Sequence, residues 1–300
     1  MDFSKLCLFD KLPKNIQGLV WMFLTTILVV TMHTFIRELS QELPPVEIAF
    51  FRNFFGFPVV LFLLSKYGWV LIRTQRMGTH VVRSLGHVAA MLMFFTGIAT
   101  TPLATTNALA FAAPLFAAAL AMVFLGERFQ WQRWGALLFG FAGTLEILRP
   151  GFISMEFGPL LILLASFIWG SILVVIKSLG RSDAPGTIIL YMVAFMTPLS
   201  LIPALFVWVW PTAEQIGLMF IMGIMGTVGQ LTTAHALKVA DTAVVMPIDF
   251  FRLVWASILG YFLFAEMLDI FTWIGGTMIF TGALYLALRE RKEQRETGSK

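Results

Sequence analysis

The sequence predicts an all-α integral membrane protein with ten transmembrane helices arranged as two five-helix inverted repeats. The first observation is composition: hydrophobic residues make up 58% of the 300 residues and charged residues only 13%, whereas soluble domains carry about 25% charged residues. The second is that the apolar runs are continuous and about twenty residues long, which suits helices that cross a bilayer and not the alternating strands of an outer-membrane barrel. The third is a weak internal repeat.

The apolar runs follow one another with connections too short to hold a soluble domain. The expected helices are 16–36, 45–65, 80–99, 102–124, 131–149, 157–178, 185–210, 214–236, 241–263 and 270–289. Several helix starts carry proline or glycine, at Pro44–Pro45, Pro102, Pro150–Gly151, Pro185–Gly186 and Pro211, because a proline there removes an N–H that would be unpaired anyway. Residues 1–15 are polar, and the run that follows has no small-residue cleavage site, so it is expected to be a retained helix.

Basic residues predict the orientation of the helices. With the N-terminus in the cytoplasm, 17 of the 21 lysines and arginines fall on the cytoplasmic side, two (Arg37 and Arg149) on the opposite side and two inside helices. This bias is the positive-inside pattern of membrane proteins. It places both termini in the cytoplasm and explains the net charge of +4 without a nucleic-acid partner. The single cysteine, Cys7, excludes an internal disulfide and a thiolate metal cluster.

The two halves of the chain resemble each other at a nearly constant offset. A shift of 140 places Gly18 on Gly158 and Pro45 on Pro185, and a shift of 139 places Trp134 on Trp273. Because each half has five helices, the two copies must lie in the membrane with opposite topology. The predicted units are a cytoplasmic segment 1–15, a first repeat 16–150, a second repeat 151–289 and a cytoplasmic tail 290–300. Inverted repeats are typical of secondary transporters, whose binding site lies between the halves near the middle of the membrane.

Charged residues inside the apolar runs are the first candidates for a binding site, since such charges normally face a protein interior or a water-filled path. Asp249 and Arg252 lie at i and i+3 on one helical face, where they either neutralise each other or line a substrate pathway. The other half has alanine at the equivalent positions, 110 and 113. Arg52 lies about 10 Å into its helix, with Glu47 as an imperfectly spaced partner at i,i+5.

A resemblance to a known family rests on motifs in both halves. The first half has Pro114 within its fourth helix, the sequence Leu-Gly-Glu at 125–127 and Arg-Pro-Gly at 149–151; the second has Ala-Leu-Lys at 236–238 and the closing Glu266. These features resemble the EamA-type repeat of the drug/metabolite transporter superfamily, which also usually has an arginine at the place of Arg52. The chain departs from the repeat at Ala265, where glycine is expected, and at Leu253, which stands opposite Pro114.

The resemblance implies a ten-helix carrier of small organic metabolites with a central cavity and no ATP hydrolysis, near the subgroup that contains bacterial S-adenosylmethionine uptake carriers. It also implies which helices line the cavity. The candidate substrate contacts are Asp249, Arg252, Arg52, Trp169, Trp255, Phe95 and Phe111; the candidate gate or hinge residues are Pro114, Pro247, Glu127 and Glu266; and His87 and His33 are candidate proton relays.

The sequence therefore predicts a secondary active transporter of zwitterions such as amino acids or S-adenosylmethionine, working by alternating access in a bacterial inner membrane. An exporter of amino acids or drug-like metabolites in the same family is the alternative. A membrane enzyme is the alternative of another class, but the four histidines are scattered without metal-ligand spacing or a nucleophile–base motif. The expected partners are a small-molecule substrate and the lipid bilayer, with a homodimer left open and no cofactor, metal or nucleic acid.

Overall fold

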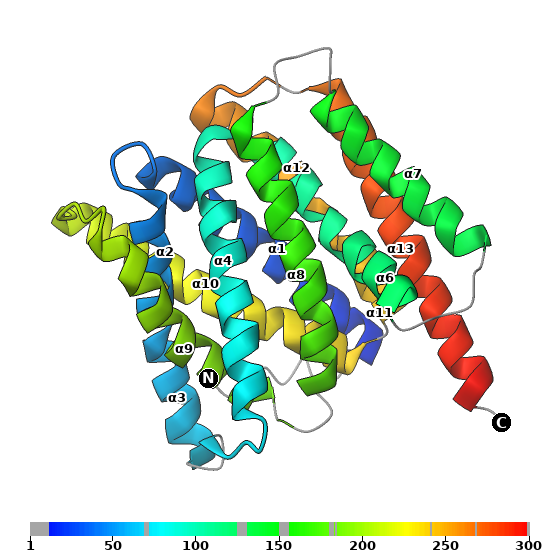
Figure 1. Ribbon diagram of the computed structural model, residues 1–300, viewed down its shortest axis with the longest axis horizontal. Helices are drawn as coiled ribbons and strands as arrows, with labels where there is room; N and C mark the ends of the chain where they lie inside the picture. The colour runs from blue at the N-terminus through cyan, green and yellow to red at the C-terminus, as the bar shows by residue number, and fades with distance from the viewer. Residues whose placement is uncertain are drawn as a thin grey trace.

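The protein is described by a computed structural model covering residues 12–68, 72–124, 131–149, 156–179, 183, 185–240, 242–267 and 269–298. Within these residues the regular structure is helical (Figure 1). The helices are α1 (Lys14–Leu39), α2 (Pro45–Phe54), α3 (Phe57–Tyr67), α4 (Met77–Thr100), α5 (Leu103–Ala110), α6 (Ala112–Phe124), α7 (Trp131–Leu148), α8 (Phe157–Leu179), α9 (Pro185–Leu205), α10 (Ala213–Val239), α11 (Thr242–Asp249), α12 (Phe251–Phe264) and α13 (Ile270–Gly298).

Three of the expected helices are each interrupted once. The 45–65 run divides into α2 and α3, the 102–124 run into α5 and α6 at Phe111, and the 241–263 run into α11 and α12 at Phe250. Proline explains the first two breaks, because its ring clashes with the carbonyl four residues earlier. The residues four before Pro58 and Pro114 are the last residues of α2 and α5. Pro247 lies inside α11, and the break comes after it.

Two helix ends also differ from the sequence prediction. The expected 185–210 helix ends as α9 at Leu205, and a capping box between Thr212 and Gln215 then starts α10. The expected tail 290–300 continues α13 as far as Gly298, since its glutamates, lysines, arginines and glutamine are good helix formers. Eight stretches in the described residues are long and apolar enough to cross a membrane, and α8 contributes a shorter apolar stretch, Phe157–Ile172.

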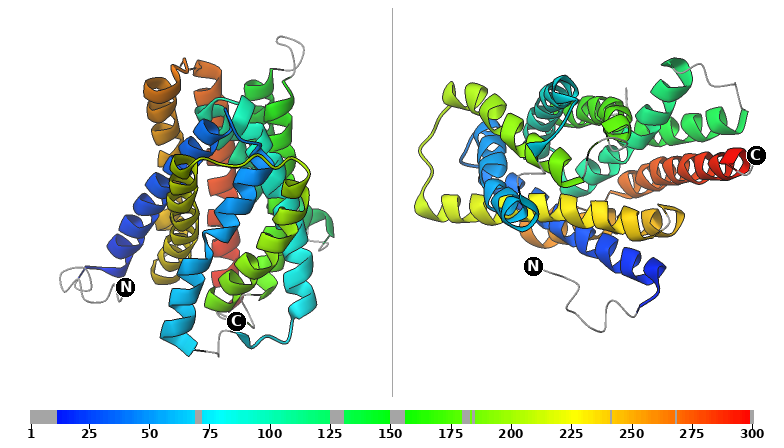
Figure 2. Two further views of the ribbon diagram at one scale, coloured as in Figure 1. Left: turned by 90° about the vertical axis from the view of Figure 1, so that its left-hand side faces the viewer. Right: turned by 90° about the horizontal axis from the view of Figure 1, so that it is seen from below.

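Helix contacts come in matched sets between the two halves (Figures 1 and 2). Helix α1 packs along α10, and its counterpart α8 packs along α4. Helix α1 also contacts α11 and α12, as α8 contacts α5 and α6. Two further contacts join counterparts directly, α7 with α13 and α2 with α9, and α5 also contacts α12. Buried side chains from nearly all of these helices form one continuous apolar core.

Polar contacts join the helices at both ends of the bundle. We call the end at which α1 begins the Lys14 end and the end at which it finishes the Arg37 end. At the Lys14 end, His80 Nε2 lies 2.7 Å from Asp183 Oδ2, and both side chains are buried. Thr74 Oγ1 donates to the same carboxylate over 2.7 Å. The start of α4 is thereby attached to the residues that precede α9.

Candidate functional site

The two charges predicted in the middle of the second half contact each other. Arg252 Nη2 donates to Asp249 Oδ2 across the break between α11 and α12, and both side chains are largely buried. The Arg252 guanidinium lies over the Phe111 ring, 5.0 Å from its centroid, in a cation–π contact. Arg252 Nε is buried without a hydrogen-bond partner in the described residues. The two charges therefore neutralise each other across the helix break, while the Arg252 Nε–H stays buried without a partner in the described residues.

The breaks in the two equivalent helices meet beside this pair. Phe111 and Phe250 are related by the repeat offset of 139, and their rings stack with centroids 6.0 Å apart and an interplanar angle of 22°. Phe280 of α13 closes on both rings, at 5.6 Å and 4.8 Å. The structure thus brings the predicted residue Phe111 to Arg252 by crossing α5–α6 against α11–α12.

His33 of α1 connects this centre to the first half. Its Nδ1 lies 3.2 Å from Oδ1 of Asn107 in α5, and its ring packs 5.1 Å from Phe94 of α4. His33 is close enough to Arg252 and Arg52 to interact with both charges. Asn107, which is fully buried, is a polar residue of the centre that sequence reasoning did not select; as a lone amide in an apolar run it gave little signal.

Aromatic candidates lie on two sides of the centre. The Trp169 ring contacts Phe94 at 4.9 Å and His87 at 6.0 Å, and its indole N–H is buried without a partner in the described residues, as is His87 Nδ1. Trp255, from the other half, donates its indole N–H to Thr26 Oγ1 over 3.2 Å. Phe95 is buried in the apolar core.

Arg52 is a buried cation without a carboxylate. Only 6% of the residue is exposed, its Nη1 donates to Asn53 Oδ1 over 3.1 Å, and Asn53 Nδ2 donates to Ser200 Oγ over 3.2 Å. Glu47 does not pair with it; that carboxylate accepts the backbone N–H of Val209 instead, at 3.0 Å. Within the described residues, no carboxylate lies at ion-pair distance from Arg52.

Arg83, one of the 17 basic residues expected on the cytoplasmic side, lies inside α4 and is only 3% exposed. Its Nη1 donates to the Ile188 carbonyl over 3.4 Å, and its Nε is buried with no partner in the part of the chain described. Arg83 and Arg52 both lie close enough to His87 to interact electrostatically with it. The place of Arg83 seven residues into a helix was the signal in the sequence that this side chain could be buried. Counting the basic residues on each side of the membrane does not use that signal. Arg52 and Arg83 are therefore two buried cations with no carboxylate at ion-pair distance in the described residues, and an anionic group would offset their charge.

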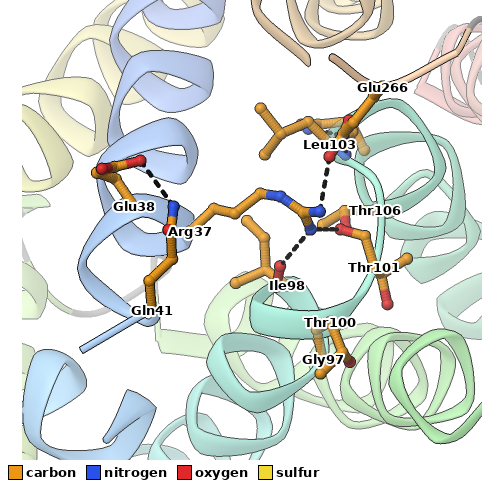
Figure 3. A network of polar contacts seen from close by, with 11 residues as sticks. Arg37, Glu38, Gln41, Gly97, Ile98, Thr100, Thr101, Leu103, Thr106 and Glu266 are labelled. Carbon is orange, nitrogen blue, oxygen red and sulfur yellow. Dashed lines mark hydrogen bonds and ion pairs between the residues drawn. The ribbon is translucent and has the colours of Figure 1, made fainter. Parts of the chain in front are cut away.

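Glu266, a predicted gate residue, joins four helices at the Arg37 end (Figure 3). Its carboxylate lies 2.9 Å from Arg37 Nη2 and accepts the Leu103 N–H at 2.8 Å. Arg37 also donates to the carbonyls of Ile98 and Thr101. The cation thus meets the carbonyl end of α4, and the anion meets the N–H end of α5, which suits both helix dipoles. Burial raises the pKa of the Glu266 carboxyl, and the Leu103 N–H and Arg37 oppose that rise.

A cavity of about 250 Å³ lies beside this contact. It is formed at the Arg37 end by α5, α7, α8, α12 and α13 together with the residues that adjoin them. Its lining includes Glu156, Ser257, Glu266, Asp269 and Arg149. Of the predicted site residues, only Glu266 lines it. The predicted substrate contacts lie deeper in the bundle, in and around the crossing of the broken helices.

The remaining hinge candidates are placed as follows. Pro114 is the third residue of α6, within its first turn, and accounts for the interruption at Phe111. Pro247 lies in α11, two residues before Asp249. Glu127 lies outside the described residues. In the described residues, no group of three His, Cys, Asp or Glu side chains has the arrangement of a metal site.

Known proteins resemble this chain over nearly its whole length. An S-adenosylmethionine uptake transporter of Rickettsia prowazekii is 28% identical over 94% of this chain and 96% of its own. A riboflavin transporter of Rhizobium johnstonii is 27% identical over 98% and 99%, and the pseudopaline exporter CntI of Pseudomonas aeruginosa is 26% identical over 90% and 96%. A solved crystal structure with 18% identity has the same fold, with a TM-score of 0.63 over 92% of this chain and 98% of that one.

The model of the EamA-like transporter family matches the chain twice, at residues 16–149 and 156–288. Both matches contain motifs on which the sequence resemblance rested, including Pro114 in the first and Glu266 in the second. Family members and the relatives described above are transporters and not enzymes, and the apolar helices place the chain in a membrane. The protein is therefore an integral membrane transporter that belongs to the EamA-like family.

Proposed function

We propose that this transporter is a secondary active carrier of small zwitterionic metabolites, working by alternating access between ten membrane-spanning helices. The observation that carries the proposal is the set of buried charges around the crossing of the broken helices. Arg52 is buried without a carboxylate in the described residues, and Asp249 and Arg252 form a pair that can exchange partners. A zwitterion would place its carboxylate at Arg52 or Arg252 and its amine or sulfonium at Asp249.

The proposed topology is two five-helix inverted repeats with both termini in the cytoplasm. The proposed location is the inner membrane of a bacterial cell. The matched helix contacts of the two halves support this topology, because exchanging the halves turns the contacts of α1 with α10, α11 and α12 into those of α8 with α4, α5 and α6. Joining the helices across the three breaks leaves ten segments, in agreement with the alternation of basic residues. In this orientation the Arg37 end faces away from the cytoplasm.

We propose uptake as the transport direction, because the name of the S-adenosylmethionine relative states uptake. The name of the riboflavin relative gives no direction and is compatible with uptake. The exporter relative makes export the alternative. The binding charges come from a single chain, so a monomer contains the complete site. A homodimer is the alternative.

Uptake into proteoliposomes tests the proposal. We expect S-adenosylmethionine or an amino acid to accumulate, and riboflavin serves as a comparison solute without a zwitterionic head. The Asp249→Ala, Arg252→Ala double variant is expected to lose uptake while remaining folded, because both charges are removed together and neither is left buried alone. Full uptake by this double variant would contradict the site, and product formation without transport would contradict the function.

A further inference from the structure

The cavity at the Arg37 end combines polar and apolar walls. Its polar lining includes three carboxylates, from Glu156, Glu266 and Asp269, and one guanidinium, from Arg149. Ile147, Leu148, Leu160 and Met267 supply apolar surface. A volume of about 250 Å³ is several times the share of one water in the liquid, roughly 30 Å³. The space therefore suits a small organic group better than a single bare ion.

The charges around the cavity leave a negative excess. Asp269 Oδ2 lies 2.8 Å from Arg149 Nη2, and Glu266 lies 2.9 Å from Arg37, which stands behind it. Glu156 is exposed at the edge. With Arg37 included, three carboxylates meet two guanidinium groups, so the lining attracts a cation and repels an anion.

An unpartnered hydroxyl gives the second indication of a ligand. Ser257 of α12 is only 5% exposed, lines the cavity, and its Oγ has no hydrogen-bond partner in the described residues. Most serines in the spanning helices donate to a carbonyl three or four residues earlier, as Ser166 and Ser200 do. A buried hydroxyl that forgoes this bond is destabilising unless another group binds it.

We infer that this cavity is a vestibule that binds a small organic cation, such as the ammonium or sulfonium end of a solute, with Ser257 as a hydrogen-bonding partner. The inference rests on the proposed function, because it gives the carried zwitterion a first binding site outside the central one. A cation that reaches Glu266 competes with Arg37 for the carboxylate. Binding in the vestibule therefore weakens the contact that joins α1, α4, α5 and α12 at this end.

The test uses the purified full-length protein in detergent, titrated in a calorimeter with choline, tetramethylammonium and 3,3-dimethylbutan-1-ol. The last compound has the shape of choline and lacks its charge. We expect both cations to bind and the neutral compound not to bind. Glu156→Gln is expected to weaken both cations by about two- to fivefold, the effect of a partly exposed ion pair. Glu38→Gln, which removes an exposed carboxylate at the same end but outside the cavity, is the control and is expected to leave both affinities unchanged.

Ser257→Ala separates the hydroxyl from the charge. It is expected to weaken choline, which carries a hydroxyl, by about two- to tenfold, and to leave tetramethylammonium unchanged. Equal binding of the neutral compound would overturn the inference. So would loss of cation binding in Asp249→Asn with normal binding in Glu156→Gln, because the cation would then occupy the central pair. Either result leaves the uptake assay of the double variant unaffected, so the vestibule and the proposed function fail separately.

Discussion

Gly260→Ala provides a direct test of the contact made by Glu266. Replacing glycine by alanine inside a helix ordinarily stabilises it by about 0.5–1 kcal/mol. At Gly260 of α12, however, an added Cβ would overlap Oε2 of Glu266 and lie 3.3 Å from its Cδ. The carboxylate would have to move away from the Leu103 N–H and from Arg37, which hold it at 2.8 Å and 2.9 Å.

The expected magnitude follows from the bonds that are lost. A hydrogen bond to a charged group contributes roughly 1.5–3 kcal/mol, and we take the lower part of that range because the Arg37 and Glu266 side chains retain 18% and 11% exposure. After the gain in helix propensity is subtracted, Gly260→Ala should destabilise the protein by about 0.5–1.5 kcal/mol. In a Glu266→Ala background the obstacle is absent, and the same change should stabilise by about 0.5–1 kcal/mol.

Thermal unfolding in detergent, followed by tryptophan fluorescence, measures this double-mutant cycle. The four proteins should show a coupling energy of about 1.5–2 kcal/mol, the bond energy that is lost only when Glu266 is present. Gly217→Ala is the matched control, because a Cβ there meets nothing within 4 Å; it should raise the melting temperature in both backgrounds. If Gly260→Ala shifts the melting temperature in the same direction with and without Glu266, the reasoning about this contact is refuted.

Three further outcomes are expected. Ala265→Gly should raise stability by about 1 kcal/mol in thermal unfolding, because Ala265 ends α12 with φ +52°, a conformation that costs residues other than glycine about 1–2 kcal/mol; a lower melting temperature would contradict this. Arg52→Lys should reduce uptake of a carboxylate solute by tenfold or more, roughly the loss of one charge-assisted hydrogen bond, and uptake unchanged in proteoliposomes would exclude Arg52 from the site. Burial raises the pKa of Glu266 above the ordinary value of 4.5, so the folded protein binds the proton more readily than the unfolded chain. As the pH falls from 7 towards 4.5, the melting temperature of the wild type should therefore rise relative to that of Glu266→Gln. A constant difference between the two melting temperatures across this range would contradict the prediction.

The sequence alone identified the residues that are costly to bury and, in Pro114, one proline that disturbs its helix. Asp249, Arg252 and Arg52 stand out because a charge in an apolar run is visible in one dimension. Pro114 indicated an interruption of its helix because the clash of a proline with the carbonyl four residues earlier is local. Ala265 is a departure from the repeat pattern, and its backbone has a left-handed conformation that glycine adopts without steric cost.

The sequence did not predict the surroundings of some charged side chains, because a hydropathy window does not show which side chains of a helix face the interior. Arg83 was assigned to the cytoplasmic charges, yet the helix turns its guanidinium towards α9, where the Ile188 carbonyl accepts from it. Glu47 was a possible partner for Arg52, but it faces Val209, 162 residues away. The surroundings of each side chain depend on how its helix crosses a neighbouring helix. That crossing cannot be read from the spacing of residues along one helix.

What the sequence determined by itself is therefore the helical membrane class, the family and the charges placed within the spanning helices, since all of these follow from local hydropathy and recurring motifs. Only the tertiary structure decided that Phe111 and Phe250 stack beside Arg252, that Glu266 reaches Leu103 across 163 residues, and that a cavity forms around an unpartnered Ser257. The physical reason is that these features depend on helices far apart in the chain coming within a few ångströms of each other, and the angle and register at which they pack fix the partners of each side chain.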